Sequence, residues 1–182
     1  MTAPPGLSPA SAPRQRFRSP SSDRVRLFPV NVDARLAELG IELPPAPAAL
    51  AAYVPVVAAG GFAFVAGQVP LEAGAVTTSG KVGADVDVER AAAAARRCAL
   101  QALSALRAEL GSLDRIRRVV RVAVYVASAA GFTDQPKVAN GASELLVDVF
   151  GDAGRHARAA VGVAELPLGA AVEVELTVQL DA

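Results

Sequence analysis

A strand is predicted over 171–180, and from Val172 to Leu180 it alternates strictly between apolar and polar side chains. Valine and leucine occupy every second position, and Glu173, Glu175, Thr177 and Gln179 stand between them. A period of two places these sets on opposite faces of one β-strand. One face of the resulting sheet is therefore apolar and must be covered, whereas the other faces water or lines a polar cavity.

Three helices are predicted, two of them long enough to cover that apolar face. The first long helix is expected over 85–110 and the second over about 135–150, each with an apolar stripe, and a short helix is expected over 31–40. Gly111 and Gly151 end the long helices. The first turn of helix 85–110 is expected to hold Asp85, Asp87 and Glu89, because the helix dipole favours anions there.

Further strands are predicted at 62–69, 117–127 and 159–164, with a hairpin or surface loop at 72–80. In 117–127 the alternation predicts one face made of Val120, Val122, Val124 and Val126, opposite Val119, Arg121, Ala123 and Tyr125. The order is strand, hairpin, helix, strand, helix, strand, strand. It predicts an α+β fold, a mixed sheet with two helices packed on one face.

One folded domain is expected over 27–182, preceded by a tail. Residues 1–26 are rich in Pro, Ser and Arg with few large apolar side chains, which predicts a flexible segment with no secretory signal. The stretch 43–71 carries no charge, but its prolines and glycines break any membrane-spanning helix. It is expected to be a loop followed by a buried strand, so no membrane association is predicted.

Charge and cysteine content narrow the function classes. Of 18 basic and 18 acidic residues, five arginines and one acid precede Leu27, which leaves 13 basic and 17 acidic residues in the domain. A net charge of −4 makes nucleic acid an unlikely partner. The lone Cys98 excludes an internal disulfide, fits a reducing cytoplasm and lies on the apolar helix stripe as a core residue. With one His and one Cys, no zinc site of the usual kind is expected.

Four ordered segments resemble the RidA/YjgF family, also called the endoribonuclease L-PSP family. They span about 51–180, and the chain looks like a less-studied branch. The segments are Tyr53-Val-Pro with Phe64-Val-Ala-Gly-Gln-Val-Pro70, then Gly111-Ser-Leu-Asp-Arg-Ile, then His156-Ala-Arg-Ala-Ala-Val-Gly-Val163, and last Leu166-Pro-Leu-Gly with Val172-Glu-Val-Glu175.

This resemblance implies a chorismate-mutase-like fold whose sheets form a homotrimeric barrel with ligand clefts between subunits. It implies a hydrolase, an enamine/imine deaminase that converts 2-iminoacids to ketoacids and ammonia without a metal or organic cofactor. A non-catalytic cleft that binds a small carboxylate, or an interaction protein of the same fold, is the alternative. Ribonuclease activity is a third hypothesis, and the net negative charge of the domain disfavours it, because RNA is itself negatively charged.

The resemblance also implies site residues. Arg158 would hold a substrate carboxylate, although a subunit-interface ion pair would also explain it. Glu173 would position water, or would merely line the barrel. Tyr53, Gly67 and Ala160 would also border the substrate, although sheet packing by itself would also explain Gly67.

Departures from the family pattern leave the substrate open. Ala159 and Ala160 replace a common Ser and Cys, Ala66 replaces a Ser, and the region around Asn140 requires an insertion. His156 replaces a Pro, and it either faces the cleft or caps the helix-to-strand loop.

Overall fold

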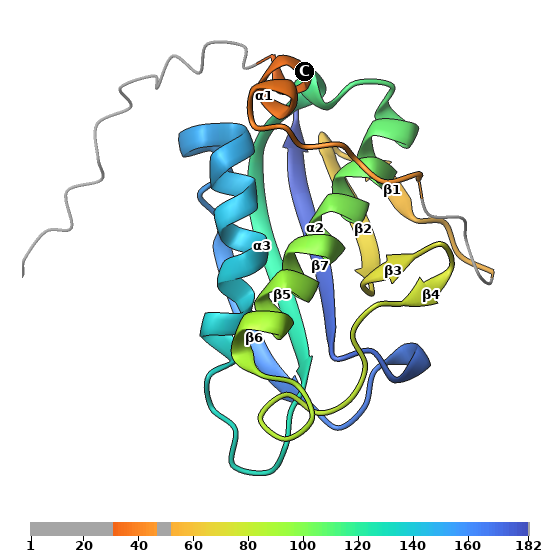
Figure 1. Ribbon diagram of the computed structural model, residues 1–182. Coiled ribbons are helices and arrows are strands. Elements are labelled where there is room, and N and C mark those ends of the chain that lie inside the picture. The colour runs from red at the N-terminus through yellow and green to blue at the C-terminus, as the bar shows by residue number, and fades with distance from the viewer. Residues whose placement is uncertain (1–30, 47–51, 182) are drawn as a thin grey trace, which may run out of the picture.

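The computed structural model describes residues 31–46 and 52–181, and its centre is a five-stranded sheet (Figure 1). The strand order is β1-β2-β7-β5-β6, with every neighbouring pair antiparallel except the parallel pair β5 and β6. The predicted 1–26 tail lies outside the described residues. The strands are β1 Val56–Ala59, β2 Phe62–Gln68, β5 Ile116–Ala127, β6 Ala157–Val163 and β7 Val172–Leu180.

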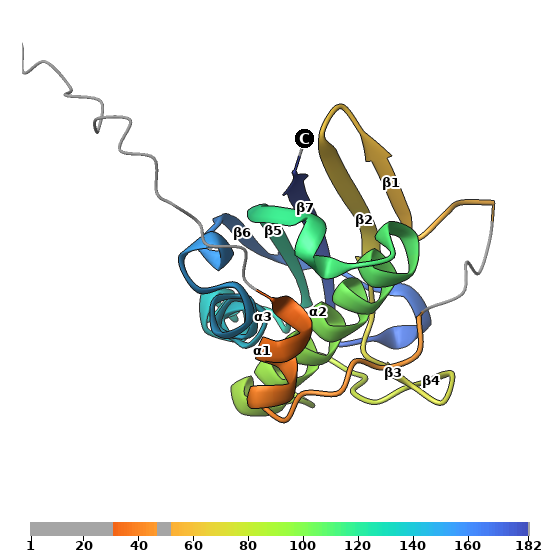
Figure 2. The same cartoon turned by 90° about the horizontal axis from the view of Figure 1, so that it is seen from above.

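Two long helices, α2 (Val88–Leu110) and α3 (Gln135–Phe150), cover one face of this sheet, as predicted (Figure 2). The short α1 (Val32–Glu38) begins at Asn31, whose side chain accepts a hydrogen bond from the Ala34 N–H at 2.9 Å. None of the helices in the described ranges is long and apolar enough to cross a membrane.

Strand β7 follows its predicted alternation and carries the core on one face. Its apolar side chains from Val172 to Val178 are buried, whereas Glu173, Glu175, Thr177 and Gln179 are partly exposed on the face without helices. The core is built from small side chains, and Cys98 lies in it with 0% exposure, as predicted.

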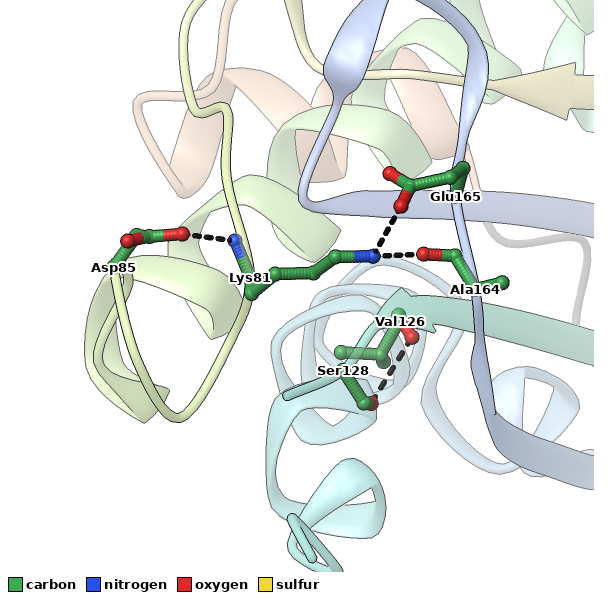
Figure 3. Close-up of polar contacts among 6 residues, drawn as sticks. All are labelled: Lys81, Asp85, Val126, Ser128, Ala164 and Glu165. Atoms are coloured by element: carbon green, nitrogen blue, oxygen red, sulfur yellow. Dashed lines mark hydrogen bonds and ion pairs between the residues drawn. The ribbon is translucent and has the colours of Figure 1, made fainter. Parts of the chain in front are cut away.

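Helix α2 begins three residues later than predicted. Asp87 is its N-cap, with Oδ1 accepting from the Arg90 N–H at 2.7 Å, so only Glu89 of the three acids lies in the first turn. Asp85 instead closes the preceding turn, where its Oδ2 accepts from the Lys81 N–H at 2.9 Å (Figure 3). Asp side chains favour caps and turns over helix interiors, which accounts for the later start.

The Lys81 side chain ties this turn to the loop that follows β6. Its ammonium group donates to the Ala164 carbonyl and pairs with Glu165 at 2.9 Å (Figure 3). The loop continues through a 3-10 turn, Pro167–Gly169, into β7.

Two features of the sheet differ from the predictions. In β5 a register irregularity between Val119 and Arg121 buries Val119 on the same side as Val122, so the predicted place of Val120 on the core face is wrong: it is only partly buried. An irregular register breaks strict alternation. Strand β1 was not predicted, because only Val56 of its four residues is buried and no alternation marks it. The predicted hairpin after β2 is present as β3 (Leu71–Glu72) and β4 (Ala75–Val76).

Candidate functional site

Arg158 lies on the edge strand β6 and is held by two polar side chains of α3. It pairs with the buried Val122 of β5, so it projects on the helix-covered face. Its Nη1 donates to Asn140 Oδ1 at 2.9 Å and to Ser143 Oγ at 3.1 Å. Arginine has five N–H donors, and the other three have no protein partner among the described residues. The guanidinium group is therefore oriented by neutral partners and keeps a free side for an anion.

His156 extends this cluster and connects it to the loop after α3. Its Nδ1 is 2.6 Å from the Gly154 carbonyl oxygen, and its Nε2 is 3.0 Å from Ser143 Oγ. Burial lowers the pKa of His156, the nearby charge of Arg158 lowers it further, and the Gly154 contact opposes both. The ring thus binds the helix-to-strand loop, which is one of the two interpretations of His156, and it also contacts Ser143.

Glu173 lies on β7 on the opposite face of the sheet. It is half-buried and pairs across the sheet with Tyr125. Burial raises the pKa of its carboxyl group, and the negative charge of Glu175 raises it further. Glu175 in turn accepts a hydrogen bond from Tyr125 Oη at 3.0 Å, and burial followed by this bond raises the pKa of Tyr125.

Gly67 makes room for the Glu173 carboxylate. A Cβ added at position 67 would lie 1.7 Å from Glu173 Oε1. This glycine stands in an irregular stretch of β2, where the register with β7 shifts between Val65 and Gln68. Both residues were predicted to belong to one site. This contact agrees with that prediction, because the Glu173 carboxylate packs against the backbone of Gly67, which has no side chain.

A cavity of about 550 Å³ lies between the end of β2, the β3–β4 hairpin and α2. Its wall includes Tyr53 and Gly67 but not Glu173. Polar side chains at its wall bind the nearby backbone: Gln101 Oε1 accepts from the Leu71 N–H at 3.0 Å, and Arg97 Nε donates to the Leu71 carbonyl at 3.0 Å. Tyr53 is exposed.

The predicted residues thus form two groups that one chain does not bring together. The first group, the β2–β7 side, consists of Gly67 on β2, Glu173 on β7, and Tyr53, which shares a cavity wall with Gly67. The second group is Arg158 and Ala160 on β6. Arg158 and Glu173 face opposite sides of the sheet, and β5 lies between their strands, a lateral separation of about 10 Å. Within one chain, Glu173 therefore does not lie beside Arg158, and the charge that raises its pKa is that of Glu175.

Ala160 shares the face of Arg158 and packs partly buried against the core, where its methyl group offers only van der Waals contact. Asn140 and Ser143 were not predicted as site residues. Two polar side chains three positions apart on a helix lie on one face, and this spacing was the available signal. Within the described ranges, no three His, Cys, Asp or Glu side chains are grouped to hold a metal ion.

Comparison with known proteins identifies the family. Residues 33–180 match the family described as "YjgF/chorismate mutase-like, putative endoribonuclease". Protein TCP17 of Trypanosoma cruzi is 50% identical over 151 residues, which cover 82% of this chain and 94% of that protein.

Two crystal structures are also similar. Atu1372 of Agrobacterium tumefaciens, a protein with unknown function, is 44% identical with a TM-score of 0.77, covering 85% of this chain and 96% of that one. A "putative endoribonuclease" of Shewanella oneidensis MR-1 is 34% identical with a TM-score of 0.79, covering 82% of this chain and 99% of that one. The chain therefore belongs to the YjgF/chorismate-mutase-like family.

Proposed function

We propose that this protein is an enamine/imine deaminase that hydrolyses 2-iminoacids to ketoacids and ammonia. The observation that carries the proposal is the Arg158 clamp. Its guanidinium group is oriented through Nη1 by Asn140 and Ser143, and its remaining N–H donors match a carboxylate bidentately. Glu173 is half-buried, and burial and the charge of Glu175 raise its pKa; this carboxyl group supplies the base.

The active site of this proposal lies between two copies in a homotrimer. Arg158 comes from one copy, and Tyr53, Gly67 and Glu173 come from its neighbour, because a single chain keeps Arg158 and Glu173 on opposite faces of the sheet. The face without helices supports such packing, since it presents apolar side chains beside its polar ones. Phe64 is 47% exposed, Val57 50% and Val161 46%. Light scattering should report three times 18.5 kDa, and a monomer would contradict the shared site.

The reaction needs one water molecule and no cofactor. Arg158 holds the carboxylate of the substrate, and Glu173 accepts a proton from water as its oxygen adds to the imine carbon. This proton then passes from Glu173 to the nitrogen, which gives a carbinolamine. The hydroxyl proton of the carbinolamine moves to the nitrogen through Glu173, the C–N bond breaks as the C=O bond forms, and ammonia and the ketoacid leave. A carboxyl group with a raised pKa accepts and returns a proton more easily near neutral pH than an ordinary glutamate does.

The test is ammonia release from 2-iminopropanoate generated in place by an amino acid oxidase acting on alanine. The native protein should accelerate the release beyond the uncatalysed rate, and Arg158→Ala and Glu173→Gln should each abolish the acceleration. Glu109→Gln, at an exposed carboxylate of α2, is the matched control and should retain it. No acceleration by the native protein would overturn the proposal.

A non-catalytic carboxylate-binding cleft is the second candidate. Two observations favour it: the Arg158 clamp is complete without Glu173, and Ala159 and Ala160 provide no hydrogen-bonding side chain beside it. In this case calorimetry should show pyruvate binding that is lost in Arg158→Ala, with no ammonia release. Arg158→Lys should also weaken binding, because an ammonium group lacks the planar fork.

A further inference from the structure

We propose that Ser143 is a nucleophile activated by His156, which makes the middle of α3, beside β6, an acyl-transfer site in addition to a carboxylate clamp. Ser143 Oγ lies 3.0 Å from His156 Nε2, and His156 Nδ1 lies 2.6 Å from the Gly154 carbonyl oxygen. A hydroxyl within reach of a base that a third group orients is the arrangement that nucleophilic catalysis requires. The inference does not use Glu173 or its water molecule.

The hydrogen-bond partners fix the direction of each proton. A backbone carbonyl only accepts, so His156 carries its proton on Nδ1 and presents a lone pair at Nε2. Arg158 only donates, so Ser143 Oγ accepts from its Nη1 at 3.1 Å. The Ser143 hydroxyl proton therefore points to His156, the one acceptor that the described contacts offer it.

The electrostatics of the cluster favour the same role. Burial and the charge of Arg158 lower the pKa of His156, which keeps Nε2 free to accept a proton at neutral pH. The guanidinium group beside Oγ stabilises negative charge that develops on the attacking oxygen. Asn140, the other partner of Arg158, is neutral and leaves that charge uncompensated.

The substrate class is a small ester that carries a carboxylate, since Arg158 retains three N–H donors for an anion. Ser143 Oγ bonds to the ester carbon, and its proton moves to His156 Nε2. The alcohol then leaves with that proton as its C–O bond breaks, and an acyl group remains on Ser143. Water, deprotonated by His156, adds to this acyl group, and the acid departs as the proton returns to Ser143.

The experiment treats the full chain with a fluorophosphonate at pH 8 and locates the adduct by intact mass and peptide mapping. In this probe the serine oxygen bonds to phosphorus, fluoride leaves, and the base takes the proton. One adduct is expected on Ser143, none in Ser143→Ala, and labelling about 100-fold slower in His156→Gln. Ser128→Ala is the control and should label normally. The Ser128 hydroxyl contacts the Val126 carbonyl and the Gln135 amide instead of a histidine (Figure 3 shows the first of these).

A second variant keeps the test decisive if His156→Gln does not fold. Cys98 is the chain's one cysteine and is buried, so Ser143→Cys introduces the sole accessible thiol. With His156 as its base, this thiol should react with iodoacetamide at pH 7 about tenfold faster than free cysteine. No adduct on Ser143, an undiminished rate in folded His156→Gln, or an ordinary thiol rate would each overturn the inference. Ammonia release without a serine adduct would overturn it alone and leave the deaminase proposal standing.

Discussion

The Glu173 carboxylate occupies the space that a side chain at Gly67 would fill, because a Cβ there would lie 1.7 Å from Glu173 Oε1. The obstructing atom is the end of a flexible side chain, and Gly67 does not have a positive φ, so alanine is tolerated by the backbone itself. The glycine therefore sets where the carboxylate sits rather than how the strand folds.

Gly67→Ala should consequently displace Glu173, abolish the proposed ammonia release and lower the melting temperature modestly, because the flexible Glu173 side chain can move aside. The change should cost less stability in a Glu173→Ala background, because the clash is then absent. Thermal melts of the two single variants and the double variant measure this coupling. Equal costs in both backgrounds would contradict the contact.

The raised pKa of Glu173 predicts a pH-dependent stability. Between the ordinary glutamate pKa and the higher folded-state pKa, the folded chain retains a proton that the unfolded chain has lost, so stability falls as pH rises through this window. Glu173→Gln removes the effect, and its melting temperature relative to the native protein should be higher at pH 7 than at pH 4. Glu109→Gln should show no such trend. The opposite slope for Glu173→Gln would exclude a desolvated carboxyl group.

Gly141 sets the distance between α2 and α3. A Cβ at this position would lie 1.9 Å from the Ala92 carbonyl oxygen, which is backbone and cannot move aside alone. Gly141→Ala should therefore destabilise the fold by about 1–3 kcal/mol despite the better helix propensity of alanine. Denaturant unfolding measures this loss. Glu144→Ala, at an exposed position of the same helix, is the control and should change stability by about 0.5 kcal/mol or less.

The exposed apolar side chains on the open sheet face predict the position of the subunit interface. Phe64→Glu places a charge where the proposed trimer buries an aromatic ring, and it should convert trimers to monomers in light scattering. Ala108→Glu adds the same charge on the outer surface of α2 and should leave the assembly intact. If Phe64→Glu still forms trimers, the subunit interface does not include this part of the open sheet face.

Much of the fold follows from periodicity alone. Strand β7 and helix α3 match their predicted segments closely, because their burial patterns are regular over nine and sixteen residues. Strand β1 and the irregularity in β5 are not predictable in this way, since the first has one buried residue and the second interrupts the alternation.

The site residues, too, are only partly predictable from the sequence. Arg158 and Glu173 are found from short motifs, and strand alternation can assign each to a face once the pairing with β5 is known. Asn140 and Ser143 become partners of Arg158, and His156 a partner of Ser143, only when α3 packs beside β6. The two Arg158 bonds join residues 18 and 15 positions apart in the sequence. No local pattern reports that packing.

The division of the site between β6 and the β2–β7 side has a genetic consequence for the proposed trimer. A chain carrying Arg158→Ala still offers a sound Glu173, and a chain carrying Glu173→Gln still offers a sound Arg158. Two inactive alleles expressed together should therefore complement each other, with about a quarter of the clefts in randomly mixed trimers receiving both intact residues. Activity in the co-expressed mixture and none in a chain bearing both substitutions would demonstrate that neighbouring copies share each site.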